Sequence, residues 1–207
     1  MTPVLEIHPL TAQRWDDAVA VFGTRGDPAR CWCQWFRMRN PQWRSATTAS
    51  NRAGLRRQAE GASAGHPPPG VVGYLDRLPV GWCGAGPRQG YPRVLASQLL
   101  RADAVAADVE DPDVWSVTCF VVRAGRRNQG LSLGLLEAAV ELAGAFGARV
   151  VEGYPIDVDV KAAAGTPIST SGLYHGALST FLKAGFREVA RPSPARPVVR
   201  LELPPDT

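Results

Sequence analysis

The stretch VTCFVVRAGRRNQGLSLGLL, residues 117–136, decides how the rest of the chain is interpreted. It begins with an apolar run typical of a buried strand, passes through a short basic turn with glycines, and continues as an amphipathic helix. The first backbone N–H groups of a helix have no partner within it, and the helix dipole favours a negative charge there. Gly130 lets the backbone approach a ligand closely, and Arg126 and Arg127 add positive charge. The stretch therefore predicts a binding site for a polyanionic cofactor.

The composition is typical of one globular domain. The chain has 207 residues, of which 45% are hydrophobic and 20% charged, so we expect residues 1–207 to form a single domain. The net charge of +4 comes without a basic tail or block, which argues against nucleic acid as a partner. No apolar run is long enough to span a bilayer, and the first residues lack a signal-peptide pattern. We therefore expect a protein that binds no membrane. The four cysteines are scattered and do not suggest a set of disulfides, so we expect the protein in the reducing cytoplasm.

Helical and strand patterns alternate along the chain. The periodicity predicts helices near residues 11–22, 48–60, 94–101, 131–146 and 176–184. It predicts strands near residues 71–75, 80–85, 114–122, 149–153, 186–190 and 198–203. Residues 155–172 lack apolar periodicity and are expected to form a long loop, which in a compact domain is usually functional or mobile.

Two motifs resemble those of the GCN5-related N-acetyltransferase (GNAT) superfamily. RNQGLS at 127–132 is similar to its Arg/Gln-x-x-Gly-x-Gly/Ala signature, and FLKAGF at 181–186 is similar to the Tyr-x-x-x-Gly-Phe that ends its late helix. The runs CWCQW, GWC, EGYP and AGF resemble a bacterial subgroup without a defined substrate. The resemblance implies a mixed α/β fold. Its central, mostly antiparallel sheet would have about six or seven strands, splayed at the middle and flanked by about four helices.

The same resemblance implies acetyl-CoA as the cofactor, with coenzyme A as the product. The pantetheine arm would lie in the splay beside Val122, where a backbone N–H near Phe120 or Val121 would hold the thioester oxyanion. Phe181 is also expected beside the cofactor, although the superfamily often has there a Tyr that protonates the departing thiolate. The pyrophosphate would lie on the amides at the start of the helix, among the expected cofactor contacts Arg127, Asn128, Gln129, Gly130, Leu131, Ser132 and Leu133.

An amine acceptor requires a base, because most alkyl amines are protonated at neutral pH. Glu152 lies in an otherwise apolar strand, where burial would suit it to accept a proton, and it is predicted as a catalytic residue. A structural ion pair is the alternative. Tyr174 and His175 precede the late helix and are also predicted as catalytic, either of them as the acid or His175 as the base, with ordinary packing as their alternative.

Aromatic residues of the first half predict an acceptor pocket, with Trp35 and Trp82 as substrate contacts and Trp32, Phe36 and Trp43 nearby. A buried core cluster is the alternative. Asp157, in the long loop, is predicted to hold a cationic substrate unless it is merely solvated. The cysteines and the three histidines lack the spacing of a zinc site, so no metal is expected.

The leading hypothesis is an acetyl-CoA-dependent N-acetyltransferase. This transferase would acylate a primary amine of a small molecule. The amine would attack the thioester directly while both substrates are bound in a ternary complex. Two alternatives stay open: an N-acetyltransferase that acts on a protein, and a non-catalytic acyl-CoA-binding or protein-interaction module. A P-loop nucleotide site is disfavoured because the Gly-x-x-x-x-Gly-Lys-Ser/Thr run is absent. Whether the chain forms a homodimer is open.

Overall fold

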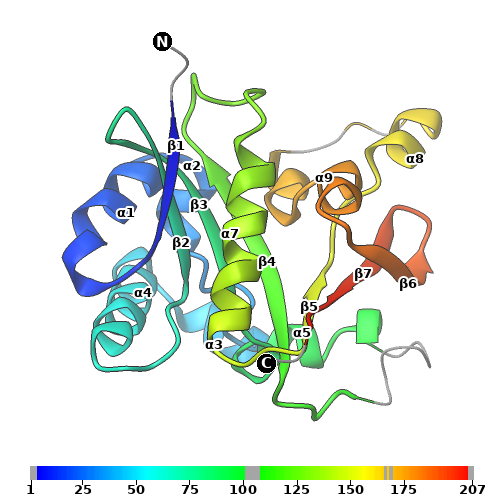
Figure 1. The fold of residues 1–207 in the computed structure, drawn as a ribbon, viewed down its shortest axis with the longest axis horizontal. Coiled ribbons are helices and arrows are strands. Elements are labelled where there is room, and N and C mark those ends of the chain that lie inside the picture. The colour runs from blue at the N-terminus through cyan, green and yellow to red at the C-terminus, as the bar shows by residue number, and fades with distance from the viewer. Residues whose placement is uncertain (1–3, 101–107, 166, 168–169, 205–207) are drawn as a thin grey trace.

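The computed structural model describes residues 4–100, 108–165, 167 and 170–204. Within them, seven strands form one sheet in the order β1-β2-β3-β4-β5-β7-β6 (Figure 1). The strands are β1 Leu5–Pro9, β2 Gly70–Leu75, β3 Leu78–Pro87, β4 Val114–Val122, β5 Val150–Gly153, β6 Arg187–Ser193 and β7 Arg196–Glu202. Neighbouring strands are antiparallel except β4 and β5, so the mostly antiparallel mixed α/β sheet is confirmed.

Helices cover both faces of this sheet. They are α1 Trp15–Phe22, α2 Gly26–Cys31, α3 Asn40–Ser45, α4 Thr48–Ser63, α5 Pro92–Leu95, α7 Leu131–Ala145, α8 Val158–Ala163 and α9 Leu178–Lys183. Short 3-10 turns are η1 Ala12–Arg14, η2 Arg88–Gly90, η3 Gln98–Leu100 and η4 Thr170–His175. Among the described residues, no helix has both the length and the apolar character needed to cross a membrane.

The alternation of side chains along each strand builds a core on each face of the sheet. Val71 and Phe120 face α7 and α9, whereas the next residues, Val72 and Val121, face α1 and α4. In Figure 1, α7 lies across the middle of the sheet, over β3 and β4. Both faces of the central strands are therefore buried, which explains their nearly continuous apolar sequences.

Several elements differ from the sequence prediction. Strand β1 and helices α2 and α3 were not predicted, and the helix expected at 94–101 is divided into α5 and η3, with Arg101 outside the described residues. Residues 155–172, expected to form a loop, contain α8. This short helix is capped by Asp157, whose carboxylate accepts a hydrogen bond from the Val160 N–H at 3.2 Å. Because this cap and not an apolar face stabilises α8, the sequence shows no helical periodicity of apolar residues there.

The splay is the feature of the sheet that positions the site. β4 pairs with β5 from Val114 to Val117 and no further. Beyond that point the chain after β5 turns aside, and Ile156 pairs with Ala177 instead. On the other edge of β4, the register against β3 shifts between Val117 and Cys119. Residues 118–122 thus keep a strand partner on the β3 side only, and the expected splay at the middle of the sheet is confirmed.

Candidate functional site

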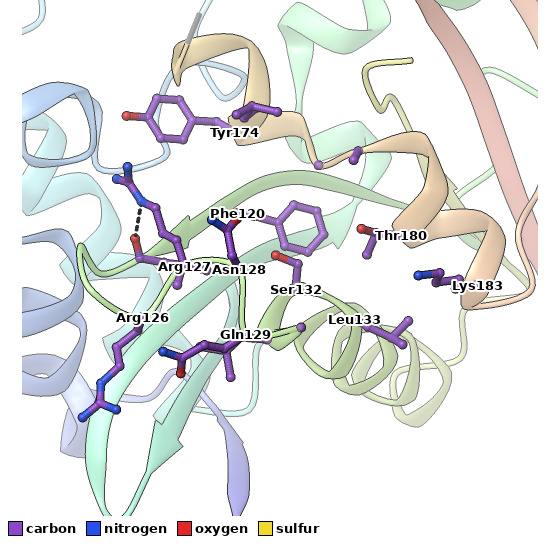
Figure 2. Close-up of a pocket in the computed structure, with 16 residues that line it drawn as sticks. Phe120, Arg126, Arg127, Asn128, Gln129, Ser132, Leu133, Tyr174, Thr180 and Lys183 are labelled. Carbon is purple, nitrogen blue, oxygen red and sulfur yellow. Dashed lines mark hydrogen bonds between the residues drawn. The ribbon is translucent and has the colours of Figure 1, made fainter. Parts of the chain in front are cut away.

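A pocket of about 390 Å³ lies at the splay, between β4, the basic turn and α9 (Figure 2). We call it the turn pocket. Arg126 and Arg127 project from the turn on one side of it, and Thr180 and Lys183 face them from α9 on the other. The residues predicted as cofactor contacts that line it are Phe120, Val122, Arg127, Asn128, Gln129, Gly130, Leu131, Ser132 and Leu133.

The backbone of the turn presents unpaired donors to this pocket. Asn128 and Gly130 both adopt the left-handed conformation, with φ of 62° and 74°. Gly130 is the N-cap of α7 and brings no side chain to cap it. Within the described residues, the backbone N–H groups of 129–132 donate no hydrogen bond. Successive unpaired N–H groups at a turn that leads into a helix form a concave anion-binding site.

The side chains of the turn pocket add charge of one sign. Three of its lining residues, Arg126, Arg127 and Lys183, are cationic, and no Asp or Glu of the described part of the chain lines it. Arg127 donates from Nε to the Val122 carbonyl at 3.4 Å, which holds its stem along the turn. Among the described residues, Arg126 and Lys183 form no ion pair. The pocket is therefore suited to a polyanion.

A second pocket, of about 600 Å³, opens beside the first. We call it the aromatic pocket, because Trp35, Phe36 and Trp43 line it and the two indoles meet edge to face at 4.9 Å. Its other lining residues are polar, charged or sulfur-containing, together with Gly172: Asp27, Arg30, Cys31, Cys33, Thr118, Cys119, Tyr174, His175 and Arg196. Tyr174 lines both pockets, so the two cavities meet at its side chain.

Tyr174 and His175 have shifted proton affinities at this junction. Burial, reinforced by the negative charge of Asp27, raises the pKa of the Tyr174 phenol, which therefore carries its proton at neutral pH. Burial, reinforced by the positive charge of Arg196, lowers the pKa of His175 from 6.5 to about 4. The imidazole is thus neutral at pH 7, and it packs edge to face on Phe36 at 5.2 Å.

Cys31 and Cys33, two of the cysteines that line the aromatic pocket, are thiols. Burial raises the pKa of Cys31 to about 12, and burial also raises that of Cys33. Neither is a nucleophile or a base at neutral pH. Among the described residues, no group of three or more His, Cys, Asp or Glu side chains is arranged to hold a metal ion. His175 and Asp27 are therefore the candidate proton acceptors among the described residues that line the pocket.

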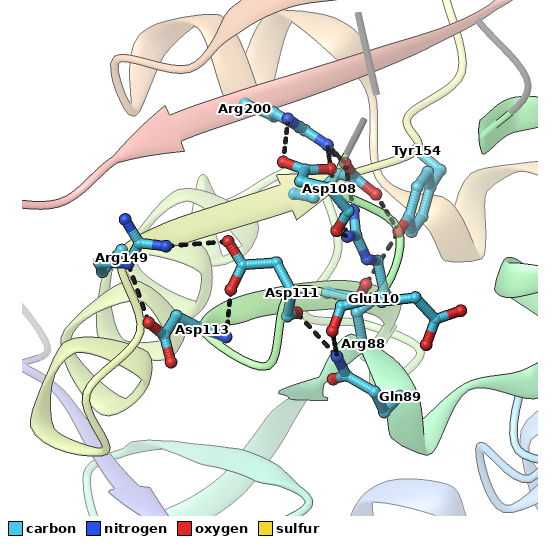
Figure 3. A network of polar contacts seen from close by, with 11 residues as sticks. Arg88, Gln89, Asp108, Glu110, Asp111, Asp113, Arg149, Tyr154 and Arg200 are labelled. Carbon is cyan, nitrogen blue, oxygen red and sulfur yellow. Dashed lines mark hydrogen bonds and ion pairs between the residues drawn. The ribbon is translucent and has the colours of Figure 1, made fainter. Parts of the chain in front are cut away.

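Glu152 lies outside both pockets, and its side chain is 0% exposed. Its carboxylate accepts hydrogen bonds from Arg88 at 3.2 Å, from Arg200 at 2.8 Å and from the Tyr154 hydroxyl at 2.5 Å. Figure 3 shows Arg88, Arg200 and Tyr154 in this network together with Asp108, which pairs with both arginines. These contacts are those of a structural ion pair, the alternative that the sequence analysis gives for Glu152.

Four other predicted contacts also lie outside the pockets. Trp82 is fully buried under α1 and donates from its indole N–H to Cys33 Sγ at 3.0 Å, so it belongs to the core. Asp157 caps α8 and pairs with Arg191 at 2.9 Å, which lowers its pKa. Val121 faces the α1 side of the sheet. Phe181 is fully buried and packs edge to face against Phe120 at 5.9 Å, beneath the turn pocket.

The structure adds residues that sequence reasoning missed. Thr180 and Lys183 line the turn pocket from α9, and their spacing of three, which places them on one helix face, was a signal that could have identified them. Asp27, Arg30 and Arg196 line the aromatic pocket from α2 and β7. Nothing in the sequence brings these two elements together, since they lie at opposite ends of the chain.

No protein-family model matches the sequence, and no curated protein matches it. Solved structures resemble its fold. The PaiA N-acetyltransferase from Thermoplasma acidophilum, in complex with coenzyme A, has a TM-score of 0.53 at 10% identity, over 97% of this chain and 99% of that chain. The GNAT domain of S. lividans PAT has a TM-score of 0.51 at 13% identity, over 96% and 90%.

A third solved structure is the aminoglycoside acetyltransferase AAC(6')-Ib in complex with coenzyme A and kanamycin. Its TM-score is 0.51 at 14% identity, over 96% of this chain and 95% of that chain. At such low identity the similarity concerns the arrangement of the elements, and it covers nearly the whole length of each chain. The chain therefore has the fold of the GCN5-related N-acetyltransferases.

Proposed function

We propose that this protein is an acetyl-CoA-dependent N-acetyltransferase that acylates a primary amine of a small molecule. The observation that carries the proposal is the meeting of the two pockets at Tyr174, one built for a polyanion and the other walled by aromatic rings. Two of the structures with this fold contain coenzyme A, and one of them contains an amine-bearing small molecule, kanamycin.

The residues of the turn pocket fit coenzyme A. The unpaired amides of 129–132 match a pyrophosphate, and Arg126, Arg127 and Lys183 provide charge for its phosphates. The edge of β4 at residues 118–122, which lacks a strand partner on the β5 side, offers backbone groups to the amides of a pantetheine arm. Bound acetyl-CoA supplies a thioester, whose acyl carbon is open to attack by an amine.

The residues at the junction divide the proton transfers between them. A backbone N–H of β4 near Phe120 polarises the thioester carbonyl and stabilises the developing oxyanion. The neutral imidazole of His175 takes a proton from the attacking amine, and the Tyr174 phenol donates one to the departing sulfur. Tyr174 thereby takes the place of the tyrosine that Phe181 replaces in the superfamily motif.

A steady-state assay tests the proposal. Purified protein is mixed with acetyl-CoA and a panel of primary amines, and the release of free thiol is followed while both concentrations are varied. We expect turnover with intersecting lines in double-reciprocal plots, because the two adjoining pockets allow both substrates to be bound at once. Coenzyme A binding in calorimetry without turnover on any amine would favour the non-catalytic module. No turnover and no binding would refute the proposal.

A further inference from the structure

Arg196, the first residue of β7, is the feature of the aromatic pocket that the proposed function leaves unused. Its side chain lines the pocket and is partly buried, and burial lowers its pKa. Within the described residues, it forms no ion pair and donates no side-chain hydrogen bond. A guanidinium partly withdrawn from water is costly without an anionic partner.

Other buried or partly buried arginines have hydrogen-bond partners within the protein. Arg88 and Arg200 share the carboxylates of Glu152 and Asp108. Arg37 donates to the Tyr91 hydroxyl, and Arg93 donates to oxygens of Trp35 and Asn40. The contrast indicates that the partner of Arg196 is not part of the protein. Its position in the wall of an open cavity makes a ligand the natural source of the missing anion.

We propose that the acceptor amine carries a carboxylate, which Arg196 binds in the aromatic pocket. This proposal rests on the proposed transferase function and names its substrate class: an amino acid or a related amine with one carboxylate and a flat, apolar body. A planar guanidinium binds a carboxylate through two parallel hydrogen bonds, which fixes the orientation of the acceptor as well as its affinity.

The remaining walls of the aromatic pocket determine the rest of the acceptor. Trp35, Phe36 and Trp43 present ring faces and edges suited to an aromatic or other flat group. The volume of about 600 Å³ suits a single small molecule. Formal charges of the lining, Asp27 against Arg30 and Arg196, give a net positive pocket. A polycation such as kanamycin is therefore disfavoured as an acceptor of this protein.

His175 connects the carboxylate to the reaction. The positive charge of Arg196 contributes to the low pKa of His175. A bound carboxylate would neutralise that field, so the imidazole would become a stronger base when an acceptor of this class is present. The other charged groups that line the pocket, Asp27 and Arg30, lie on α2 and are exposed, so their effect on the ring is more strongly screened.

Matched pairs of acceptors test this proposal. L-Tryptophan, L-tyrosine and L-phenylalanine are each compared with the corresponding amide, which keeps the amine and the ring but lacks the anionic charge. We expect kcat/KM at least 10-fold higher for the acids, the range given by loss of a charged hydrogen bond. Arg196→Gln should lower kcat/KM of the acids by about 10- to 100-fold, mainly through KM, and should thereby reduce the preference for each acid over its amide by at least 10-fold.

The matched control is Arg187→Gln, which removes an exposed arginine of the neighbouring strand β6 that lines neither pocket. It should leave the acids and amides unchanged. Calorimetry with coenzyme A monitors the integrity of each variant, and titration of L-tryptophan into the coenzyme A-loaded protein measures acceptor binding without turnover. Tighter binding of the acid than of its amide, lost in Arg196→Gln, supports the proposal.

Three results would overturn the assignment. Amides or simple amines used as well as the acids would refute the carboxylate while leaving the transferase intact, as would equal loss on both in Arg196→Gln. Binding of coenzyme A with no thiol release and no acceptor binding would refute this proposal together with the proposed function. The calorimetric and kinetic readouts thus separate the two failures.

Discussion

At the scale of single residues, Tyr174 connects the two pockets. Its side chain lines both cavities, and its phenol is protonated at neutral pH. The superfamily motif places a tyrosine where this chain has Phe181, whose ring is fully buried and has no proton to donate. In the proposed mechanism, the proton donor therefore lies on η4 in this protein and not on α9.

Tyr174→Phe tests this role. Removal of one hydroxyl should lower kcat by about 10- to 100-fold, near the lower end for general acids because a thiolate is a good leaving group. Affinity for coenzyme A should be unchanged, since the ring remains. Steady-state kinetics and calorimetry measure the two quantities. An unchanged kcat would show that the thiolate departs without this proton.

His175 predicts a dependence of stability on pH. Its pKa is about 4 in the folded protein and near 6.5 when unfolded, so the unfolded state binds the proton first as the pH falls. Its neutral form thus favours folding fully above pH 6.5, and that contribution is lost progressively between pH 6.5 and 4. At pH 4.5 the loss amounts to roughly 2–3 kcal/mol.

Urea denaturation at pH 7 and pH 4.5 measures this loss. In His175→Gln the fall in the free energy of unfolding between the two pH values should be smaller by that amount. His66→Gln, which changes an exposed histidine, is the control and should behave like the wild type. A fall of the same size in His175→Gln would contradict the buried, neutral imidazole.

Some residues of the aromatic pocket could be predicted from the sequence, whereas others could not be distinguished from residues of the core. Tyr174 and His175 were identified by their place before the late helix, and both line the aromatic pocket. Trp35 and Trp82 stood in similar aromatic runs, yet Trp35 lines the pocket and Trp82 is buried under α1. Composition cannot separate the two, because the face of the sheet on which Trp82 lies is decided by the register of β3.

At the scale of elements, the start of α7 is expected to bind the phosphates. Gly130 and Gly147 lie at opposite ends of this helix, have φ of 74° and 78°, and have open space where a Cβ would lie. Alanine at either position should cost about 1 kcal/mol of stability through the left-handed backbone. Gly130→Ala alone should weaken coenzyme A binding, by about 10-fold, the effect of losing one charge-assisted hydrogen bond.

Calorimetry with both variants, and thermal unfolding as a check of their stability, make the comparison. Both variants place an alanine in a left-handed backbone of similar φ, so the backbone strain is the same in each. A difference in their affinity for coenzyme A therefore shows at which end of α7 the cofactor binds. Equal affinity in the two variants would contradict binding at the start of α7.

β5 gives a second prediction at this scale. Glu152→Gln removes the negative charge that Arg88 and Arg200 share, and breaking a buried pair should cost about 3 kcal/mol of unfolding free energy. Glu188→Gln, in the more exposed pair with Arg191, should cost less than about 1 kcal/mol. Urea denaturation measures both. A stable Glu152→Gln protein without turnover would restore Glu152 as the base.

Elements with a strong apolar pattern were predicted best. β4 has the predicted bounds, and α7 begins at the predicted residue, because burial of both faces and a helical stripe leave clear periods in the sequence. β1 was missed because an edge strand of five residues is too short to show a pattern. α8 was missed because a cap at Asp157 and the contact of Asp157 with Arg191 stabilise it locally.

At the scale of the whole molecule, one topological event creates the site. β4 and β5 separate after Val117. The chain after β5 returns through η4, which contacts β4 where β4 has lost its strand partner on the β5 side. This return brings Tyr174 to the junction and places the aromatic pocket against α2 and β7. The two motifs predicted the fold, but residues from α2, β4, η4 and β7 meet only through tertiary packing, which a local pattern does not encode.

In the proposed complex, coenzyme A lies on the amides before and at the start of α7 and along the edge of β4 that lacks a strand partner. Backbone amide NMR of the ¹⁵N-labelled protein during a titration with coenzyme A tests it most directly. We predict the largest shift changes at residues 129–133 and 119–122, with α4 and the end of α7 unaffected. Saturating binding with the changes clustered elsewhere, or no change at any amide, would contradict the account.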